Sequence, residues 1–361
     1  MSSNFGKCIQ VSLFGQSHSA GIGVVMTGIP AGHRIDMEAL QAHMQRRAPG
    51  NSEYATPRKE ADLPEILSGI VDGYTCGAPI SAIIRNTNTK SKDYEQMKVI
   101  PRPGHADFTA MIRHQGFQDV RGGGHFSGRL TAPLCFAGAI CMQILEEQGI
   151  YLGAHISSIA EIEDTRIDAL NVTPSQLQAV KEKAFPTLCE DKGREMIDTI
   201  VKAKKQSDSV GGVIELCVLG MPVGVGEPMF EGIENKLAQA VFAIPAVKGI
   251  EFGLGFEVAS VYGSTNNDAF YYDEQGNVKT KTNHHGGILG GMSSGMPIIM
   301  RAAFKPTPSI AREQESINIK SKEAEKLVIK GRHDPCIVPR AVPCVESAAA
   351  IALLDLLFQK V

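Results

Sequence analysis

The sequence lacks the long apolar runs of membrane proteins and the positive surplus of general nucleic-acid binders. No run of 18 apolar residues occurs, and the stretch Leu130 to Leu145, which has neither a charged residue nor a histidine, has 16 residues. The net charge of -3 and the pI near 6.4 argue against displacing counterions from a phosphate backbone. The first residues, MSSNFGKCIQVSLFG, contain no hydrophobic core behind a basic segment. We therefore expect a cytoplasmic protein that binds neither nucleic acid nor membrane.

Several common binding signatures are also missing. The eight cysteines are scattered without a C-x-x-C pair, which favours reduced core cysteines over a disulfide framework or a metal site. Neither G-x-x-x-x-G-K-[ST] nor G-x-G-x-x-G occurs, and H-E-x-x-H is absent. One match to G-x-S-x-G, residues 291–295, is followed by the β-rich run MPIIM rather than by a helix, so it does not indicate a hydrolase elbow. Any bound anion must be held in another way.

One segment is rich in groups that bind anions. Between Arg102 and Arg129 the chain has four arginines, three histidines and six glycines in 28 residues, and no lysine. Guanidinium groups grip carboxylate and phosphate oxygens in a fixed plane, and glycines let backbone N–H groups approach an anion closely. This composition predicts a site for a multiply charged small molecule.

The expected secondary structure mixes strands and helices without a regular βαβ rhythm. Alternating and β-branched patterns predict strands at 7–14, 22–26, 66–71, 80–85, 213–219 and 296–304. Helices are expected from the N-cap Asp36 to Arg47, over the apolar segment 131–147, from the capping box Thr173–Gln176 toward Phe185, at 233–242 and at 344–358. A further charged helix is expected after the turn KPTPS. Two polar loops, near 48–62 and 86–98, are expected to be mobile.

Widely separated motifs resemble those of one family. Gly15-Gln16-Ser17-His18 with Gly23 is similar to the signature G-E-S-H-x-x-x-x-G of chorismate synthases, and Arg102 to Asp107 reproduces its R-P-G-H-A-D motif. Gly331 to Pro335 gives G-R-H-D-P, and the segments NHHGGILGG and KPTPS also resemble family counterparts. The resemblance runs from Phe5 to about Phe358.

The resemblance implies a lyase that catalyses the anti-1,4-elimination of phosphate from 5-enolpyruvylshikimate 3-phosphate. The product is chorismate, the last intermediate of the shikimate pathway to aromatic amino acids, and reduced FMN assists without net redox change. The substrate carries roughly three to four negative charges, counting about -1.5 to -2 for its phosphate, so several arginines must converge on it. By resemblance, Arg47, Arg102 and Arg129 bind substrate.

The resemblance also assigns catalytic and cofactor roles. His105 is expected to protonate the leaving phosphate, His18 to serve the reduced flavin, and Asp334 to help remove the ring hydrogen. The residues expected to bind the cofactor are His125, Phe126, Ser127, Ala246, Gly290, Lys305, Pro306, Thr307, Pro308, Ser309 and Arg332.

The sequence departs from the family pattern within the anion-binding segment. His125, Phe126 and Leu130 stand where many members have arginine, serine and glutamate. Gln16, Glu53 and Pro245 are further departures, and Glu53 weakens the case for a nicotinamide nucleotide contact. We expect this protein to grip its flavin differently from most relatives, with His125 partly replacing the lost arginine.

The expected fold is α+β, a single domain over 1–361 arranged as a β-α-β sandwich with helices packed between antiparallel sheets. The resemblance further implies a homotetramer. An external flavin reductase or NADPH as an indirect reductant would supply reduced FMN, and the missing dinucleotide fingerprint favours an external source.

Two other functions stay open from the sequence. One is a non-catalytic flavin- or phosphate-binding protein that kept the scaffold, and the other is a flavin-independent phosphate lyase. His18, His105 and Asp334 together favour the flavin-dependent lyase over the first, and the glycine and KPTPS clusters argue against the second.

Overall fold

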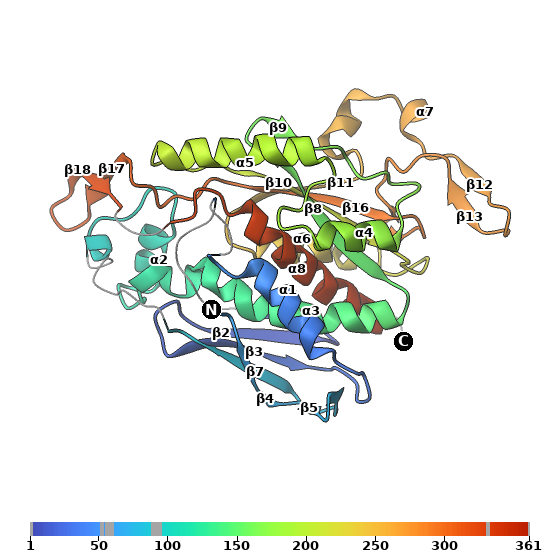
Figure 1. The fold of residues 1–361 in the computed structure, drawn as a ribbon, viewed down its shortest axis with the longest axis horizontal. Helices are drawn as coiled ribbons and strands as arrows, with labels where there is room; N and C mark the ends of the chain where they lie inside the picture. Colours follow the sequence, from blue (N-terminus) through green and yellow to red (C-terminus); the bar gives the residue numbers. More distant parts are fainter. Residues whose placement is uncertain (1–2, 51–53, 55–60, 88–95, 330–332, 360–361) are drawn as a thin grey trace.

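The structure is a computed structural model that describes residues 3–50, 54, 61–87, 96–329 and 333–359. The two loops expected to be mobile lie largely outside these ranges, as do Glu53 and Arg332. Helices and antiparallel sheets are mixed throughout, which confirms the expected α+β class (Figure 1).

The first sheet is built from the N-terminal part of the chain. Its five antiparallel strands run in the order β1 (Asn4–Phe5), β2 (Gln10–Gly15), β3 (Gly21–Thr27), β7 (Ile80–Arg85) and β4 (Pro64–Ser68). Along β7 every second side chain is buried, because strand neighbours point to opposite faces of a sheet. The buried face carries Val24, Met26 and Ile80 into the core.

The second sheet comes from the C-terminal half. Its order is β11 (Val247–Phe252), β16 (Ile298–Phe304), β10 (Gly212–Leu219), β8 (Tyr151–Ile159) and β9 (Ile162–Glu163), again all antiparallel. The long strands β8, β10 and β16 are buried over most of their lengths. Both faces of this sheet are therefore covered.

Apolar helices lie between the two sheets (Figure 1). These are α1 (Met37–Arg47), α3 (Thr131–Glu147), α6 (Ile233–Phe242) and α8 (Val338–Gln359). A Cβ on Gly138 of α3 would lie 2.1 Å from the Cβ of Ser347 on α8, so glycine permits this close crossing. The segment 128–147 and α8 are long and apolar enough to cross a membrane, but 83% and 89% of their most apolar windows are buried inside the protein. They are the core helices of this fold.

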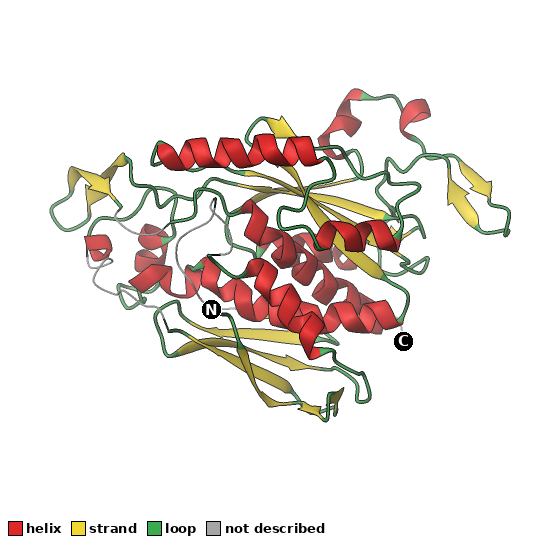
Figure 2. Ribbon diagram, viewed as in Figure 1, coloured by secondary structure: helices red, strands yellow, loops and turns green. Residues whose placement is uncertain are grey.

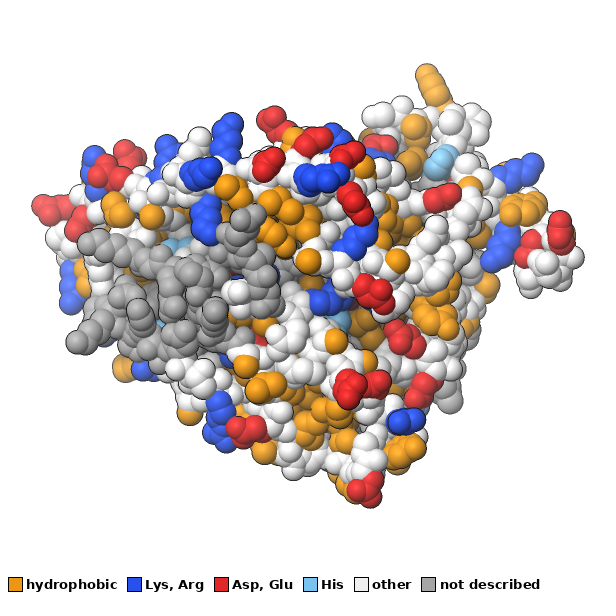
Figure 3. Space-filling view, viewed as in Figure 1, with side chains coloured by type: hydrophobic (Ala, Val, Ile, Leu, Met, Phe, Trp, Pro, Cys, Tyr) orange, Lys and Arg blue, Asp and Glu red, His pale blue; other side chains and the backbone are white. Residues whose placement is uncertain are grey.

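Two helices cover the outer face of the second sheet (Figure 2). Helix α4 (Pro174–Lys181) has the expected capping box but ends four residues before Phe185. Helix α5 (Glu190–Lys205) was not expected, although Met196, Ile200 and Ala203 recur at helical spacing on its buried side. Figure 3 shows acidic and basic side chains along the edge of the molecule where α5 lies.

Short elements complete the chain and include one correction. The prediction of a charged helix after KPTPS is wrong, because this segment forms a hairpin of β17 (Glu313–Asn318) and β18 (Glu323–Val328). Exposure alternates along β17, and Lys326 pairs with Glu313 across the hairpin at 2.5 Å. The abundance of glutamate and lysine suggested a helix. The alternation of exposed and half-buried side chains along β17 and the ion pair between Lys326 and Glu313 favour strands instead.

The remaining short elements lie in loops. The 3-10 turns are η2 (Gln96–Lys98), η3 (Arg121–Phe126), η4 (Gly128–Leu130), η5 (Met229–Glu231) and η6 (Gly255–Ser260). Short helices are α2 (Asp107–Arg113) and α7 (Gly263–Asn266), and the paired short strands are β5 (Ile70–Val71) with β6 (Tyr74–Thr75), β12 (Phe270–Tyr272) with β13 (Val278–Thr280), and β14 (Ile288–Leu289) with β15 (Met292–Ser293). The segment 266–295, for which the sequence predicts no strand or helix, contains two hairpins.

All eight cysteines are free thiols, as expected from their spacing. Five are buried, Cys189 is half-buried, and Cys8 and Cys76 are exposed.

Candidate active site

A cavity of about 600 Å³ opens beside the N-terminal ends of α3 and α8. Its walls combine the expected residues Arg47, Arg102, His105, His125, Phe126, Ser127, Arg129, Ala246, Lys305, Thr307, Pro308, Ser309 and Asp334. Apolar side chains from the end of α6, including Phe242, Ile244 and Val247, form another part of the lining. The fold thus gathers motifs from the whole length of the chain into one site.

His105 is held by a buried carboxylate on α2. Its Nδ1 lies 2.7 Å from Oδ1 of Asp107, which only accepts, and 3.0 Å from Nη2 of Arg102, which only donates; the shorter contact, to the carboxylate, assigns the proton to Nδ1. Hydrogen bonds from Arg102 and His105 outweigh burial and hold the pKa of Asp107 well below its usual range, so it is ionised. This arrangement fixes the ring and leaves Nε2 beside Gly123, a buried glycine next to Gly122 in the cavity wall.

The Arg102 guanidinium is committed to the same group. Its Nε and Nη2 donate to Asp107 at 2.7 and 2.8 Å, and Nη1 donates to Ser309 at 3.1 Å. Only 5% of Arg102 is exposed, although the residue lines the cavity. Arg102 therefore joins the R-P-G-H-A-D motif to the KPTPS turn. The sequence predicted that Arg102 binds substrate directly, but it did not predict this connection.

Three glycines in left-handed conformation carry the chain past both histidines. Gly122, Gly123 and Gly124 have φ values of 59°, 83° and 56°. A Cβ on Gly122 would lie 2.4 Å from the ring of His18, and a Cβ on Gly123 would lie 3.1 Å from Nε2 of His105. His18 is itself buried and contacts the cavity wall through Gly122 rather than lining the cavity.

The substituted stretch after the glycines is anchored by His125. Its Nδ1 lies 2.7 Å from the carbonyl oxygen of Gly15, and its Nε2 lies 2.7 Å from Oγ of Ser3. A carbonyl only accepts, so Nδ1 donates to Gly15 and the ring pins the loop that carries His18. Both ring nitrogens are engaged within the protein, so His125 anchors this loop beside the cavity. The neighbouring Phe126 is partly exposed and adds an aromatic surface.

Arg47 and Arg129 converge at the floor of the cavity on one carboxylate. Asp62 pairs with Nη1 of both arginines, and all three side chains are almost fully buried. Arg47 also donates from Nε to Thr131 at 2.9 Å, and Arg129 donates to Asn86 at 3.2 Å. Burial would raise the pKa of Asp62, but the two guanidinium groups lower it overall. Among the described residues of this cluster, two guanidinium groups share one carboxylate.

Asp334 approaches the cavity from the loop before α8. Arg340, one of the residues lining the cavity, donates from Nη1 to its Oδ2 at 2.5 Å and from Nε to the carbonyl oxygen of Arg47 at 3.0 Å. Arg340 therefore fixes Asp334 relative to the arginine pair at the floor.

The KPTPS turn supplies a second polar end of the cavity. Lys305 and Lys248 both line it, and neither makes an ion pair with a carboxylate among the residues that the structure describes. Partial burial, together with the charge of Lys248, lowers the pKa of Lys305. The hydroxyl Oγ1 of Thr307 is buried without a hydrogen-bond partner. Two cations and an unsatisfied donor suit a phosphate group.

Two of the expected cofactor residues do not line the cavity, and a third is not described. Gly290 lies beside the start of α6, because the carbonyl oxygen of the adjacent Gly291 accepts a hydrogen bond from the Ile233 amide. The cavity lies at the other end of α6, and this helix of ten residues is about 15 Å long. Pro306 is exposed within the turn, and Arg332 lies outside the described residues.

Sequence reasoning missed four polar residues of the site. Asp107 stood inside a quoted motif, so its spacing from His105 was a usable signal. Arg340 follows Pro335 of the G-R-H-D-P motif by five residues, so its nearness to that motif was also a usable signal. Asp62 and Lys248 lie in unremarkable segments, and only the fold brings them to the cavity.

The fold and site define an enzyme for a small, multiply anionic substrate. A family model described as chorismate synthase matches residues 9–358. Chorismate synthase of Lancefieldella parvula is 45% identical over 369 residues, covering 99% of this chain and 97% of that protein. Chorismate synthase of Pyrococcus abyssi is 46% identical over 357 residues, covering 99% and 98%. A crystal structure of chorismate synthase superposes with a TM-score of 0.76 at 28% identity, covering 99% of this chain and 93% of that chain.

The chain belongs to the chorismate synthase family. It is a lyase of the shikimate pathway that eliminates phosphate from 5-enolpyruvylshikimate 3-phosphate to give chorismate.

Proposed function

We propose that the cavity binds reduced FMN next to the substrate, and that the chain catalyses the anti-1,4-elimination with His105, His18 and Asp334. The observation that carries this proposal is the cavity itself, which has separate cationic ends and aromatic surfaces between polar motifs from distant parts of the chain. Reduced flavin, when bound, lends electron density to the substrate and recovers it.

The residues present fit a flavin phosphate at the KPTPS turn. Lys305, Lys248 and the hydroxyl of Thr307 would hold it, and Phe126, Pro245 and Ala246 offer apolar surface for the ring system. Exchanging both lysines for methionine should weaken FMN binding by about tenfold or more, because each lost charge-assisted hydrogen bond is worth about 1.5–3 kcal/mol. A matched Lys279→Met change on the distant strand β13 should leave the Kd unchanged in a fluorescence titration.

The arginine pair fits the carboxylates of the substrate. Arg47 and Arg129 already grip the Asp62 carboxylate, which shows the geometry that a carboxylate ligand would meet there. The two guanidinium groups of this trio attract an anion, and Arg102 supports the site from behind through Asp107 and Ser309.

His105 is the proposed proton donor to the leaving phosphate. Asp107 holds its Nδ1–H, so that a proton carried at Nε2 would be directed toward the glycine-lined wall. Asp334, oriented by Arg340, is the proposed carboxylate for removal of the ring hydrogen. His18 would act on the flavin across Gly122, the residue that lies between the His18 ring and the cavity.

The test is anaerobic incubation of pure protein with 5-enolpyruvylshikimate 3-phosphate and chemically reduced FMN. Release of phosphate and the absorbance of chorismate should rise together, and omission of FMN should abolish both. Turnover without FMN would identify a flavin-independent lyase, and FMN binding without turnover would identify a non-catalytic flavin protein. His105→Ala should slow turnover by about two orders of magnitude or more, the scale of a lost general acid. A rate near that of the wild type would remove His105 from the mechanism.

The assembly and cellular setting are also proposals. We infer a homotetramer of single-domain, sandwich-like chains in the cytoplasm, supplied with reduced FMN by an external reductase or indirectly by NADPH. An arm bearing α7, β12 and β13 projects from the body and exposes Phe256, Tyr262 and Tyr272 by 76–85% (Figure 1). Exposed aromatic residues of this kind mark association surfaces. Light scattering coupled to size-exclusion chromatography would give four times the chain mass of 38.7 kDa if the inference is correct.

A further inference from the structure

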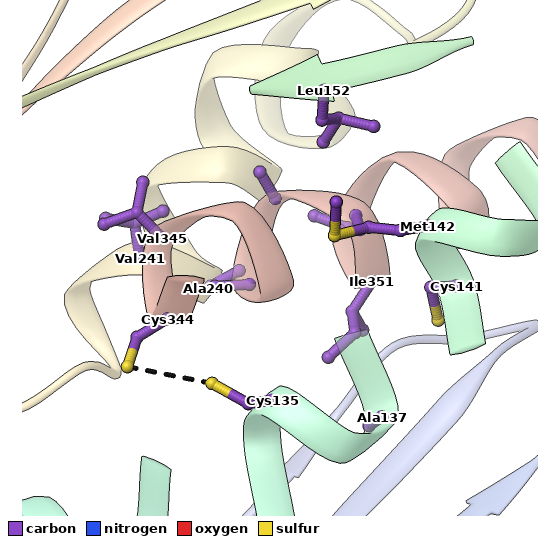
Figure 4. Packing of buried hydrophobic residues seen from close by; sticks show 14 of the residues in the cluster. Cys135, Ala137, Cys141, Met142, Leu152, Ala240, Val241, Cys344, Val345 and Ile351 are labelled. Atoms are coloured by element: carbon purple, nitrogen blue, oxygen red, sulfur yellow. Dashed lines mark hydrogen bonds between the residues drawn. The ribbon is translucent and has the colours of Figure 1, made fainter. Parts of the chain in front are cut away.

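Two cysteines meet where the core helices border the active-site cavity. Cys135 lies on α3 and Cys344 on α8, and their sulfur atoms are 3.8 Å apart (Figure 4). Both residues are almost fully buried, yet Cys344 lines the cavity. Cys344 is therefore the member of the pair that borders the cavity.

The two thiols have different surroundings. The hydrogen bond from Cys135 and the nearby guanidinium groups of Arg47 and Arg340 lower the pKa of Cys344. Burial raises the pKa of Cys135. Thiolates are the reactive form of cysteine, so this environment favours Cys344 as the sulfur that reacts first.

The distance between the sulfurs is suited to a bond. A disulfide needs about 2.05 Å between its sulfurs, so the two atoms must approach each other by about 1.8 Å. Gly138 allows α3 and α8 to lie close together at this crossing, so closing the remaining distance requires rotation of the two cysteine side chains.

We propose that Cys135 and Cys344 form a redox-active thiol pair in the cavity wall, which hydrogen peroxide converts to a disulfide that switches turnover off. In the first step the Cys344 thiolate attacks one peroxide oxygen, the O–O bond breaks, and hydroxide leaves and takes up a proton to become water. Cys344 is then a sulfenic acid. In the second step the Cys135 sulfur attacks the Cys344 sulfur, the S–O bond breaks, and the departing hydroxide takes the Cys135 proton. Overall, two thiols and one peroxide give one disulfide and two waters.

The bond would disturb the floor of the site. Cys135 lies one helical turn after Thr131, which accepts a hydrogen bond from Arg47. Cys344 lies one turn after Arg340, which holds Asp334. Drawing these turns together displaces both the arginine pair and Asp334, and displacements near 1 Å in a catalytic site cost up to about 100-fold in rate. We expect at least a tenfold loss of turnover.

The test uses the full chain with the exposed cysteines removed by Cys8→Ser and Cys76→Ser, so that surface thiols do not react. After treatment with hydrogen peroxide, free thiols are blocked, and the digested protein is analysed by mass spectrometry. The expected result is a cross-linked peptide joining Cys135 to Cys344 and the loss of two free thiols per chain. Dithiothreitol should reverse both the cross-link and the loss of turnover.

Single variants separate the two steps. Cys135→Ala should stop the reaction at a sulfenic acid on Cys344, which dimedone traps, whereas Cys344→Ala should leave Cys135 reduced. Cys141→Ala is the matched control, because Cys141 is buried on the same helix but lies away from the pair (Figure 4). In the Cys141→Ala variant, the cross-link between Cys135 and Cys344 should form as it does in the protein that carries only Cys8→Ser and Cys76→Ser.

Recovery of both cysteines as blocked thiols after peroxide treatment would overturn the proposal without requiring any core variant to fold. A complete cross-link with unchanged turnover would overturn the switch.

Discussion

Replacing Asp107 by asparagine would remove the charge that positions His105 and neutralises Arg102. Asp107 accepts four hydrogen bonds, three from Arg102 at 2.7–3.0 Å and one from His105 at 2.7 Å. An asparagine side chain keeps one oxygen but replaces the other by a donor. Where that NH2 faces His105, Nδ1 must accept, and the ring can no longer hold protons on both nitrogens.

The expected loss follows from the role of the protonated ring. General acid catalysis contributes about 10²–10⁴-fold, and an asparagine behind a catalytic histidine costs about 10⁴-fold in serine proteases. We therefore expect kcat to fall by about 10²–10⁴, which equals about 2.7–5.5 kcal/mol at ~1.36 kcal/mol per factor of ten. The Arg102 guanidinium also loses its buried counter-charge, so the melting temperature should fall.

Initial rates of anaerobic phosphate release give kcat, and circular dichroism with FMN titration shows whether the variant is folded. Glu65→Gln is the matched control, because it removes a carboxylate paired with Arg85 on the exposed edge strand β4. The double variant with His105→Ala should be no slower than His105→Ala alone, since Asp107 acts through His105. Full additivity of the two losses, or a kcat within threefold of the wild type for Asp107→Asn, would refute the reasoning.

Two further outcomes are expected. Gly122→Ala should reduce turnover more than tenfold, because its Cβ would meet the His18 ring at 2.4 Å. The control Gly116→Ala, which has a φ of 81° and open space around its Cβ, should not reduce turnover. Equal losses of turnover in the two variants would mean that backbone strain alone is responsible. His43 is buried, and burial lowers its pKa from 6.5 to about 4. The unfolded chain therefore binds the extra proton between these values, and stability falls as pH drops from 6.5 to 4, by up to about 3 kcal/mol at ~1.36 kcal/mol per pH unit. His43→Gln should flatten the melting temperature over this window, and parallel profiles for the two proteins would contradict this account.

The elements predicted best were those with a strong local signal. Helix α3 begins and ends where the apolar run predicts, and Asp36 caps α1 through hydrogen bonds from the amides of Glu38 and Ala39. Helix α8 begins six residues earlier than predicted, because Pro343 within it suggested a boundary that the packed core overrides. The β17–β18 hairpin was missed for the opposite reason, since its side chains favour helices and only cross-strand pairing selects strands.

For the site, the motifs identified the residues but not their connections. We predicted that Arg102 binds substrate directly, but not that it contacts Asp107 and Ser309. Ser309 lies 207 positions away from Arg102 in the sequence. Asp62 could not be predicted, because it lies at the end of a polar loop and acquires meaning only where α1 and η4 bring Arg47 and Arg129 together.

The central position of α8 has a consequence for synthesis. This helix follows every other described element in the chain, yet it contacts α3, α6, α1 and the second sheet, and its Asp355 accepts hydrogen bonds from the amides of Lys7, Cys8 and Ile9. At about 5–20 residues per second, translation of the preceding chain takes on the order of 20–70 seconds. During that time helices α1, α3 and α6 and the inner face of the second sheet lack this partner, so the nascent chain depends on protection from aggregation until its last helix emerges.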